Sequence, residues 1–304
     1  ASDVYKRQVS PIALALARRT DLSKPAILLA MIGGGKAGNI ISPNPNAIAA
    51  ADTFHLPLTS VMMAGIIPAV FGLILTYFLA KRLVKKGSRV SEQEVVVVDK
   101  QDLPHFGTAM IAPLCAILLL ALRPLFDIKV DPLIALPVGG LVGALCMGKI
   151  GHANRYAVSG LGKMAPVAIM LLGTGALAGI IANSGLKDVL IQGLEHSGLP
   201  SYILAPISGA LMSLATSSTT AGTAVASNVF SGTLLELGVS GLAAAAMIHA
   251  GATVFDHMPH GSFFHATGGS VNMDIKERLK LIPYESAVGL IMTIVSTLIF
   301  GVFA

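Results

Sequence analysis

The sequence predicts an all-α, polytopic membrane protein in which some of the membrane-spanning helices are broken. Its 304 residues are 54% hydrophobic and only 12% charged, whereas about 25% of the residues of a soluble domain are charged. Seven windows contain no Asp, Glu, Lys or Arg, and most approach the roughly 20 residues that a helix needs to cross a bilayer. These windows are 57–80, 103–122, 132–148, 164–186, 197–235, 237–255 and 286–304. They lack the alternation of apolar and polar residues that the strands of a membrane barrel would require.

The first predicted element is an interrupted helix at 25–41 that continues irregularly to about residue 51. Its middle, MIGGGKAGNIISPNPN at 31–46, holds four glycines, two prolines and three asparagines beside one lysine. Unpaired backbone groups are tolerated at membrane depth only where protein or a water-filled cavity satisfies them. The interruption therefore marks a candidate site in an otherwise apolar chain.

The next elements are a clear span at 57–80 and a polar linker loop at 81–106. The loop opens with Lys81, Arg82, Lys85 and Lys86, and short loops enriched in Lys and Arg are usually cytoplasmic. Helices at 107–122 and 132–148 lead outward and back to a second basic loop. The net charge of +5 is thus explained by helix orientation, and we expect no nucleic-acid partner.

The region 164–198 is predicted to be a hairpin that dips into the membrane, or else a span followed by an interfacial helix. The uncharged stretch 197–235 is too long for one crossing, since a helix rises about 1.5 Å per residue. Its middle, ATSSTTAGT at 215–223, indicates either two spans with a tight turn or one broken helix over 201–235. Helices at 241–257 and 282–304 close the chain.

An internal repeat relates two of these segments. Residues 30–50 align without a gap to residues 246–266, and six of the 21 positions are identical. In both copies an apolar helix gives way to Gly, Pro and polar residues. If five crossings separate the two copies, they run in opposite senses, and paired interrupted helices in inverted repeats are the best sequence pointer to a transporter's binding site.

This repeat predicts an inverted-repeat transporter fold divided into three parts. Residues 1–80 would be the end of the first repeat, 81–106 a cytoplasmic linker loop, and 107–304 the second repeat with hairpin 164–198 and broken helix 201–235. Because no complete span precedes Pro25 and residues 1–8 do not have the order of a signal peptide, the sequence predicts an N-terminally truncated fragment.

Four motifs stand out: GGGKAGNIISPNPNAIAAA at 33–51, LLGTGALAGIIANSGLKDVL at 171–190, SLATSSTTAGTAVAS at 213–227 and HAGATVFDHMPHGSFF at 249–264. In these motifs the chain resembles the gluconate permease family, the GntP-type gluconate:proton symporters. The resemblance implies an ion-transporter-like architecture with re-entrant hairpins and broken helices. It also implies inward transport of sugar acids or related hydroxy acids with protons.

The predicted substrate site lies at the interruptions. Lys36 is costly inside a membrane, where such residues are usually functional, and its charge suits a carboxylate; the alternative is a lysine that snorkels to the interface. Amide and hydroxyl side chains would bind the substrate's hydroxyls, although small residues also serve helix packing. The candidates are Lys36, Asn39, Ser42, Asn44, Asn46, Gly173, Thr174, Ser217, Ser218 and Thr219.

The predicted proton-coupling residues are Asp256, His257 and His260. Histidine titrates near neutral pH, and chains of Asp and His relay protons in membrane proteins. A metal site is a rival interpretation, but the spacing lacks a pattern such as H-E-x-x-H. The second rival interpretation is a loop that these polar residues merely cap. Cys115 and Cys146 lie in apolar spans and are expected to be small buried hydrophobic residues and not a disulfide or metal pair. We expect no metal or other cofactor.

The sequence therefore predicts a multi-pass carrier in a bacterial-type cytoplasmic (inner) membrane, not an enzyme. Its partners would be protons, a small organic anion such as gluconate or a related sugar or hydroxy acid, and the lipid bilayer, and a homo-oligomer is compatible with the sequence. The first alternative is a sodium-coupled carrier or sodium/proton antiporter that uses Ser, Thr and Asn oxygens. A remoter one is an intramembrane metal-dependent enzyme.

Overall fold

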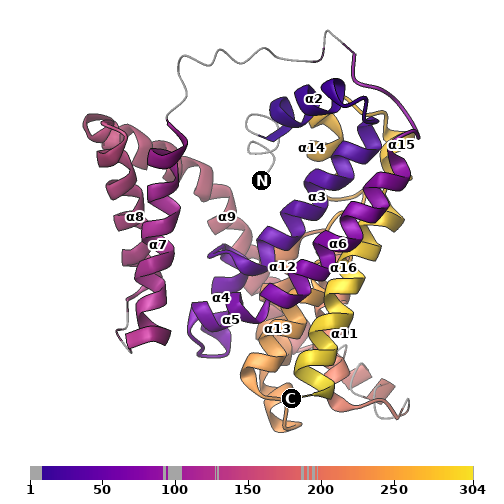
Figure 1. The fold of residues 1–304 in the computed structure, drawn as a ribbon. Coiled ribbons are helices and arrows are strands. Elements are labelled where there is room, and N and C mark those ends of the chain that lie inside the picture. The colour runs from indigo at the N-terminus through magenta and orange to yellow at the C-terminus, as the bar shows by residue number, and fades with distance from the viewer. Residues whose placement is uncertain are drawn as a thin grey trace. The chain divides into compact units, whose positions relative to one another are not determined.

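The computed structural model describes residues 9–91, 94, 105–126, 128, 130–185, 188–189, 192–193, 196 and 198–303. The named elements in these ranges are all helices (Figure 1), which confirms the all-α fold class. Within these residues two continuous helical stretches, Leu58–Leu83 and Ile275–Val302, are long and apolar enough to cross a membrane. Four other apolar helices are shorter, because breaks and turns divide the uncharged windows.

The chain forms two compact units. The smaller consists of Pro57–Thr59 and Val98–Gly173 and contains the helix pair α7 (Phe106–Phe126) and α8 (Pro132–Cys146). A Cβ added at Gly143 would lie 2.4 Å from the Cβ of Ala112. The two helices therefore approach as closely as small residues allow, the usual means of helix packing in membranes.

The larger unit, Ala1–Leu56, Ser60–Val97 and Thr174–Ala304, contains the first broken helix. In α3 (Lys24–Ile41) the helix is continuous through the three adjacent glycines, so the predicted interruption lies later, at Ser42–Asn44. There the backbone becomes extended, and Asn44 caps α4 (Pro45–Thr53) by accepting from the backbone N–H groups of Asn46 and Ala47. Pro45 at the first helical position suits this start, because its missing N–H would have no partner anyway.

The second broken helix repeats this arrangement. Here α13 (Gly241–Gly251) gives way to an irregular segment at 252–261, and the chain becomes helical again in α14 (Ser262–Ser270). Both copies of the predicted sequence repeat therefore fold as helix, break and helix.

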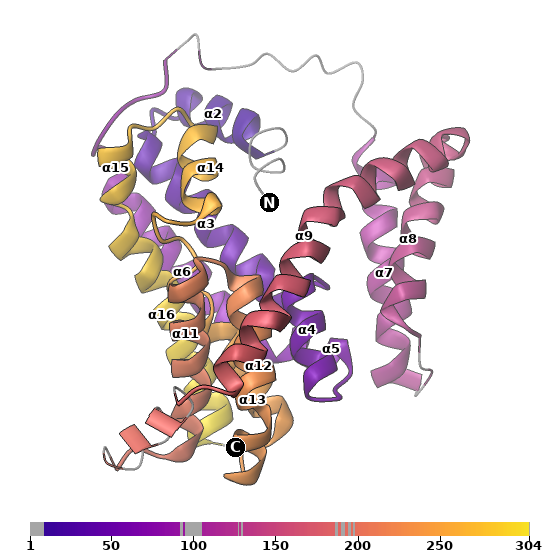
Figure 2. The ribbon, with the colours of Figure 1, turned by 180° about the vertical axis from the view of Figure 1, so that it is seen from behind.

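The two broken helices run in opposite directions, as Figures 1 and 2 show from two sides. At one end, the ammonium of Lys24 in α3 donates to the carbonyl of Asn272, which follows α14, at 3.0 Å. At the other end, Gly241 at the start of α13 lies beside Phe54, the residue after α4. An antiparallel pair of broken helices is the arrangement that an inverted repeat predicts.

A helical hairpin lies against these helices. Its arms are α11 (Leu204–Thr216) and α12 (Thr219–Glu236), and Ser217 between them has left-handed backbone angles. A Cβ added at Gly222 would lie 2.7 Å from the backbone nitrogen of Ser213, so the arms pack side by side. The predicted break in helix 201–235 is therefore present, but the chain reverses at Ser217–Ser218 instead of continuing as one crossing.

The chain does not turn back at Gly173 and Thr174. These residues lie inside α9 (Ala153–Ala182), a single helix of 30 residues. Glycine alone does not end a helix; it costs only about 1 kcal/mol relative to alanine, and no proline follows to stop the chain. A helical hairpin is formed instead by α11 and α12.

Two long helices, α6 (Ile66–Leu83) and α16 (Ile282–Thr297), pack beside α3 (Figure 1). The free side of α6 exposes Ile67, Phe71, Ile74 and Phe78, a spacing that places them along one helix face. Such an apolar exposed face is typical of a helix in contact with lipid. The other elements are α2 (Ser10–Arg19), α5 (Leu58–Ala64), η4 (Ile150–His152), η5 (Ser201–Ile203), α15 (Ile275–Leu279) and η6 (Leu298–Val302).

Adjacent glycines in α3 give a matched test of this packing. A Cβ at Gly33 would lie 2.1 Å from Oγ1 of Thr76 in α6, whereas a Cβ at Gly34 would meet nothing within 4 Å. We expect Gly33→Ala to destabilise the protein by about 1–3 kcal/mol, as overpacking does, and Gly34→Ala to be neutral or stabilising. Thermal unfolding in detergent measures both; equal melting temperatures would contradict the close approach of α3 and α6.

Candidate functional site

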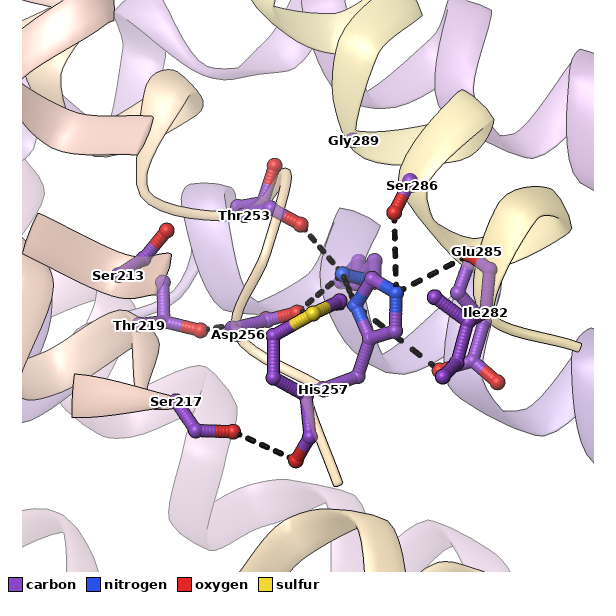
Figure 3. A network of polar contacts seen from close by, with 12 residues as sticks. Ser213, Ser217, Thr219, Thr253, Asp256, His257, Ile282, Glu285, Ser286 and Gly289 are labelled. Atoms are coloured by element: carbon purple, nitrogen blue, oxygen red, sulfur yellow. Dashed lines mark hydrogen bonds and ion pairs between the residues drawn. The ribbon is translucent and has the colours of Figure 1, made fainter. Parts of the chain in front are cut away.

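The breaks of the structure meet around one buried ion pair. Lys36 lies in α3 before the first break, Asp256 lies in the second break, and Thr219 begins α12 at the hairpin tip. The Lys36 ammonium donates to Oδ1 of Asp256 and to the backbone carbonyl of Thr253. The Thr219 hydroxyl donates to the other carboxylate oxygen at 2.6 Å (Figure 3). A single carboxylate therefore joins three segments that are far apart in the sequence.

Burial makes this pair expensive to separate. The side chains of Lys36 and Asp256 are 2% and 7% exposed. A buried charge left without its partner is strongly destabilising, so the loss of either side chain should be costly. The Lys36 ammonium is already occupied, and a substrate carboxylate would have to compete with Asp256 for it, so substrate binding by Lys36 stays a prediction.

His257 is fully buried beside the pair. Its Nδ1 lies 3.0 Å from Oδ1 of Asp256 and 3.3 Å from the Lys36 ammonium. Its Nε2 lies 3.2 Å from both the backbone carbonyl of Ile282 and the hydroxyl of Ser286, at the start of α16. The imidazole thus links the ion pair to α16.

A second buried ion pair lies next to His257. Arg278 in α15 donates to both carboxylate oxygens of Glu285 in α16, and its guanidinium also contacts the hydroxyl of Thr267 and the ring of Phe264. Arg278 is 1% exposed and Glu285 is fully buried. The nearer Glu285 oxygen is 4.0 Å from Nδ1 of His257, so the two ion pairs share one histidine.

The predicted asparagines form a separate cluster at the first break. The Asn46 amide donates to the side-chain oxygen of Asn39 at 2.8 Å and accepts from the hydroxyl of Thr220 in α12. The Asn44 amide donates to the carbonyl and hydroxyl of Ser42. This cluster joins α4 to the hairpin tip, one residue along α12 from Thr219.

The remaining predicted residues are placed differently. The Ser217 hydroxyl donates to the carbonyl of Met258 at 2.8 Å, and Ser218 caps α12 by accepting from the backbone of Ala221. These two serines therefore shape the hairpin tip. His260 is exposed and lies outside the contacts around Asp256. For Gly173 and Thr174, which lie within α9, a binding role stays a prediction.

Sequence reasoning did not single out Arg278 and Glu285. Arg278 resembled an ordinary basic loop residue, and Glu285 directly precedes the last uncharged window. The available signal was an isolated acid at the start of an apolar helix, seven residues after an arginine. Among the described residues no group of three or more His, Cys, Asp or Glu could hold a metal ion.

An apolar groove of about 650 Å³ lies beside this region, between α11 and α16. It reaches Ser286, whose hydroxyl contacts His257, but most of its lining consists of apolar residues such as Ile207, Phe255 and Leu290. A polyhydroxylated acid would lose its hydrogen bonds to water there without gaining replacements. The groove is therefore a poor candidate for the substrate site.

Comparison with known proteins shows that this chain is similar to transporters. An uncharacterized transporter of Haemophilus influenzae is 85% identical over 301 residues, which is 99% of this chain and 72% of that protein. The high-affinity gluconate transporter of Escherichia coli is 24% identical over 297 residues, covering 86% of this chain and 66% of that protein. A gluconate permease of Pseudomonas aeruginosa is 22% identical over 323 residues, covering 95% and 71%.

One family model also matches part of the chain. The Na+-H+ antiporter family model matches residues 107–197, which include α7 and α8 but none of the residues around Asp256. Proteins named as transporters or permeases are membrane proteins, in agreement with the apolar composition, and their names describe transport and not catalysis.

The Arg278–Glu285 pair can be tested for its contribution to stability. We expect Glu285→Gln to destabilise the protein by about 3–5 kcal/mol, because it leaves the Arg278 charge buried and unpaired. The double variant Arg278→Met/Glu285→Leu should recover much of this loss. The exposed Glu236 supplies the control Glu236→Gln, expected within about 0.5 kcal/mol of the parent. A double variant no more stable than Glu285→Gln in thermal unfolding would argue against this role.

Proposed function

Because the chain belongs to the transporter family of the Haemophilus influenzae protein, we propose that it is a secondary active transporter that couples a small organic anion to protons. The anion would be gluconate or a related sugar or hydroxy acid. The names of the two gluconate relatives support this substrate class. The bacterial cytoplasmic membrane, crossed several times, is the proposed location.

The observation that carries the proposal is the buried Lys36–Asp256 pair at the crossing of two broken helices. Ionisable residues inside a membrane protein are costly and usually mark a substrate or ion pathway. Broken helices place backbone ends, and therefore partial charges, at the same depth as such a site. A cation held there by an exchangeable carboxylate is suited to bind another carboxylate in its place.

The neighbouring amides and hydroxyls suit a hydroxylated anion. Asn39, Asn46 and Thr220 form a hydrogen-bonded cluster beside the hairpin tip, and Thr219 joins that tip to Asp256. Each group can exchange its present partner for a substrate hydroxyl without losing a hydrogen bond. In this proposal Lys36 binds the carboxylate, the cluster binds the hydroxyls, and Asp256 with His257 couples to protons.

The antiparallel broken helices also support transport by alternating access. Inverted repeats give two related conformations, in which one part of the protein moves against another around a central site. The two ends of the α3–α4 segment contact opposite ends of the α13–α14 segment. A symmetric exchange between these halves would open the site to either side of the membrane in turn.

A sodium-coupled carrier or sodium/proton antiporter is the second candidate. The match of residues 107–197 to the Na+-H+ antiporter family favours it. Serine, threonine and asparagine oxygens near the hairpin tip are hard ligands of the kind that alkali cations prefer. In this case uptake or proton movement would require sodium at constant pH.

Uptake by the purified protein in proteoliposomes tests the proposal. We expect labelled gluconate to accumulate under an inward proton gradient without sodium, and unlabelled sugar acids to compete. Accumulation that requires sodium at fixed pH would favour the second candidate. No accumulation of any acid under either gradient would overturn the proposed function for these substrates.

Lys36→Met should lower proton-driven uptake at least about tenfold, because a hydrogen bond to a charged group contributes about 1.5–3 kcal/mol. The matched control is Lys24→Met. Lys24 is also a buried lysine of α3 in an ion pair, with Glu94 at 2.7 Å, but it lies at the other end of the helix. Equal loss of uptake in both folded variants would mean that Lys36 acts only through stability.

A further inference from the structure

We propose that Lys36 and His257 are alternative counter-ions of Asp256, so that a carboxylate which binds Lys36 makes His257 take up one proton. This inference rests on the proposed function, because it assigns the coupling step of that transport to one carboxylate oxygen. It predicts how many protons move and where they bind.

Both cations compete for the same atom. Oδ1 of Asp256 accepts from the Lys36 ammonium and lies 3.0 Å from Nδ1 of His257. The second oxygen, Oδ2, is held by Thr219 at 2.6 Å, so the carboxylate cannot easily turn to serve both. When Lys36 leaves, Oδ1 remains beside Nδ1 of His257.

The position of His257 suits the charged imidazole. Its Nδ1 faces the Asp256 carboxylate at 3.0 Å and its Nε2 faces the carbonyl of Ile282 at 3.2 Å, and both of these groups only accept. A neutral ring carries one hydrogen and can donate to one of them, while its other nitrogen can accept from the Lys36 ammonium, 3.3 Å from Nδ1, or from the Ser286 hydroxyl, 3.2 Å from Nε2. The imidazolium carries a hydrogen on each nitrogen, so an added proton lets the ring donate to both acceptors without moving, with a charge-assisted hydrogen bond to Asp256.

The other charges around His257 stay constant. Glu285 of α16 is 4.0 Å from Nδ1, but Arg278 of α15 donates to both of its oxygens. Lys36 comes from α3 and Asp256 from the segment that carries His257 itself. Among the described residues, Asp256 is therefore the carboxylate near the imidazole whose partner can exchange.

Charge balance then couples the two events. With neutral His257, the charges of Lys36, Asp256, Arg278 and Glu285 sum to zero. A monocarboxylate that takes the Lys36 ammonium adds one negative charge and leaves Asp256 unpaired, which is costly in a buried site. A proton taken from water by the His257 imidazole restores both the pairing and the zero sum. Release of the substrate reverses the exchange, so transport of a monocarboxylate is electroneutral.

The counter-ion exchange can be tested without a substrate. In Lys36→Met, Asp256 has lost its lysine, so His257 should take the place of the lysine as counter-ion and be protonated in neutral buffer. In the parent protein, and in Lys36→Met/Asp256→Asn, it should be neutral. Nitrogen-15 NMR of labelled histidines reads the state directly, with His257→Gln assigning the signal and the exposed His152→Gln as control. A neutral His257 in folded Lys36→Met would overturn the exchange.

The coupling itself is tested on the unmodified protein with gluconate as the probe. We expect uptake of about one proton per gluconate bound, measured with a pH indicator in weakly buffered solution, and none in a His257→Gln variant that still binds. Gluconate binding without proton uptake by the unmodified protein would overturn the inference and leave the transport proposal standing. If no sugar or hydroxy acid binds, the proposed function and the substrate-linked half of the inference fall together, and the NMR comparison alone decides the exchange.

Discussion

The ion pair between Lys36 and Asp256 is the interaction on which the rest of the larger unit depends. The two residues are 220 positions apart, and each would be a costly buried charge by itself. Their pairing fixes α3 against the second break, and Thr219 adds the hairpin tip to the same carboxylate. One carboxylate therefore holds α3, the second break and the hairpin tip together, and Lys36 also donates to the Thr253 carbonyl at the second break.

Close backbone approach makes this arrangement possible. A Cβ at Gly289 would lie 2.4 Å from the Thr253 carbonyl, and one at Gly251 would lie 2.3 Å from the carbonyl of Pro206. Glycine at these positions lets α16 and α11 approach the second broken helix without side chains between them. The Thr253 carbonyl that Gly289 admits is the same one that accepts from Lys36, so packing and charge placement depend on each other.

The two ion pairs have different characters, although both are buried. Arg278 meets Glu285 through two parallel hydrogen bonds, a geometry that fixes both partners. Lys36 is a point charge with one carboxylate oxygen and one carbonyl, and its flexible chain can reach another acceptor. A rigid pair beside an exchangeable pair, with His257 between them, gives a site in which one charge can change while the surrounding charges stay fixed.

The sequence by itself determined the all-α class and the breaks near residues 42–44, 217 and 252–261, and it singled out Lys36 and Asp256 as candidates. These features follow from local causes. Proline and capping residues begin and end helices, and a charged residue inside an apolar membrane segment is energetically costly and is usually functional. Only the tertiary structure decided that Lys36 binds Asp256, that the chain reverses at Ser217, that α9 continues through Gly173, and that Arg278 pairs with Glu285. Those outcomes depend on which helices lie close enough to share partners, and no local pattern encodes that distance.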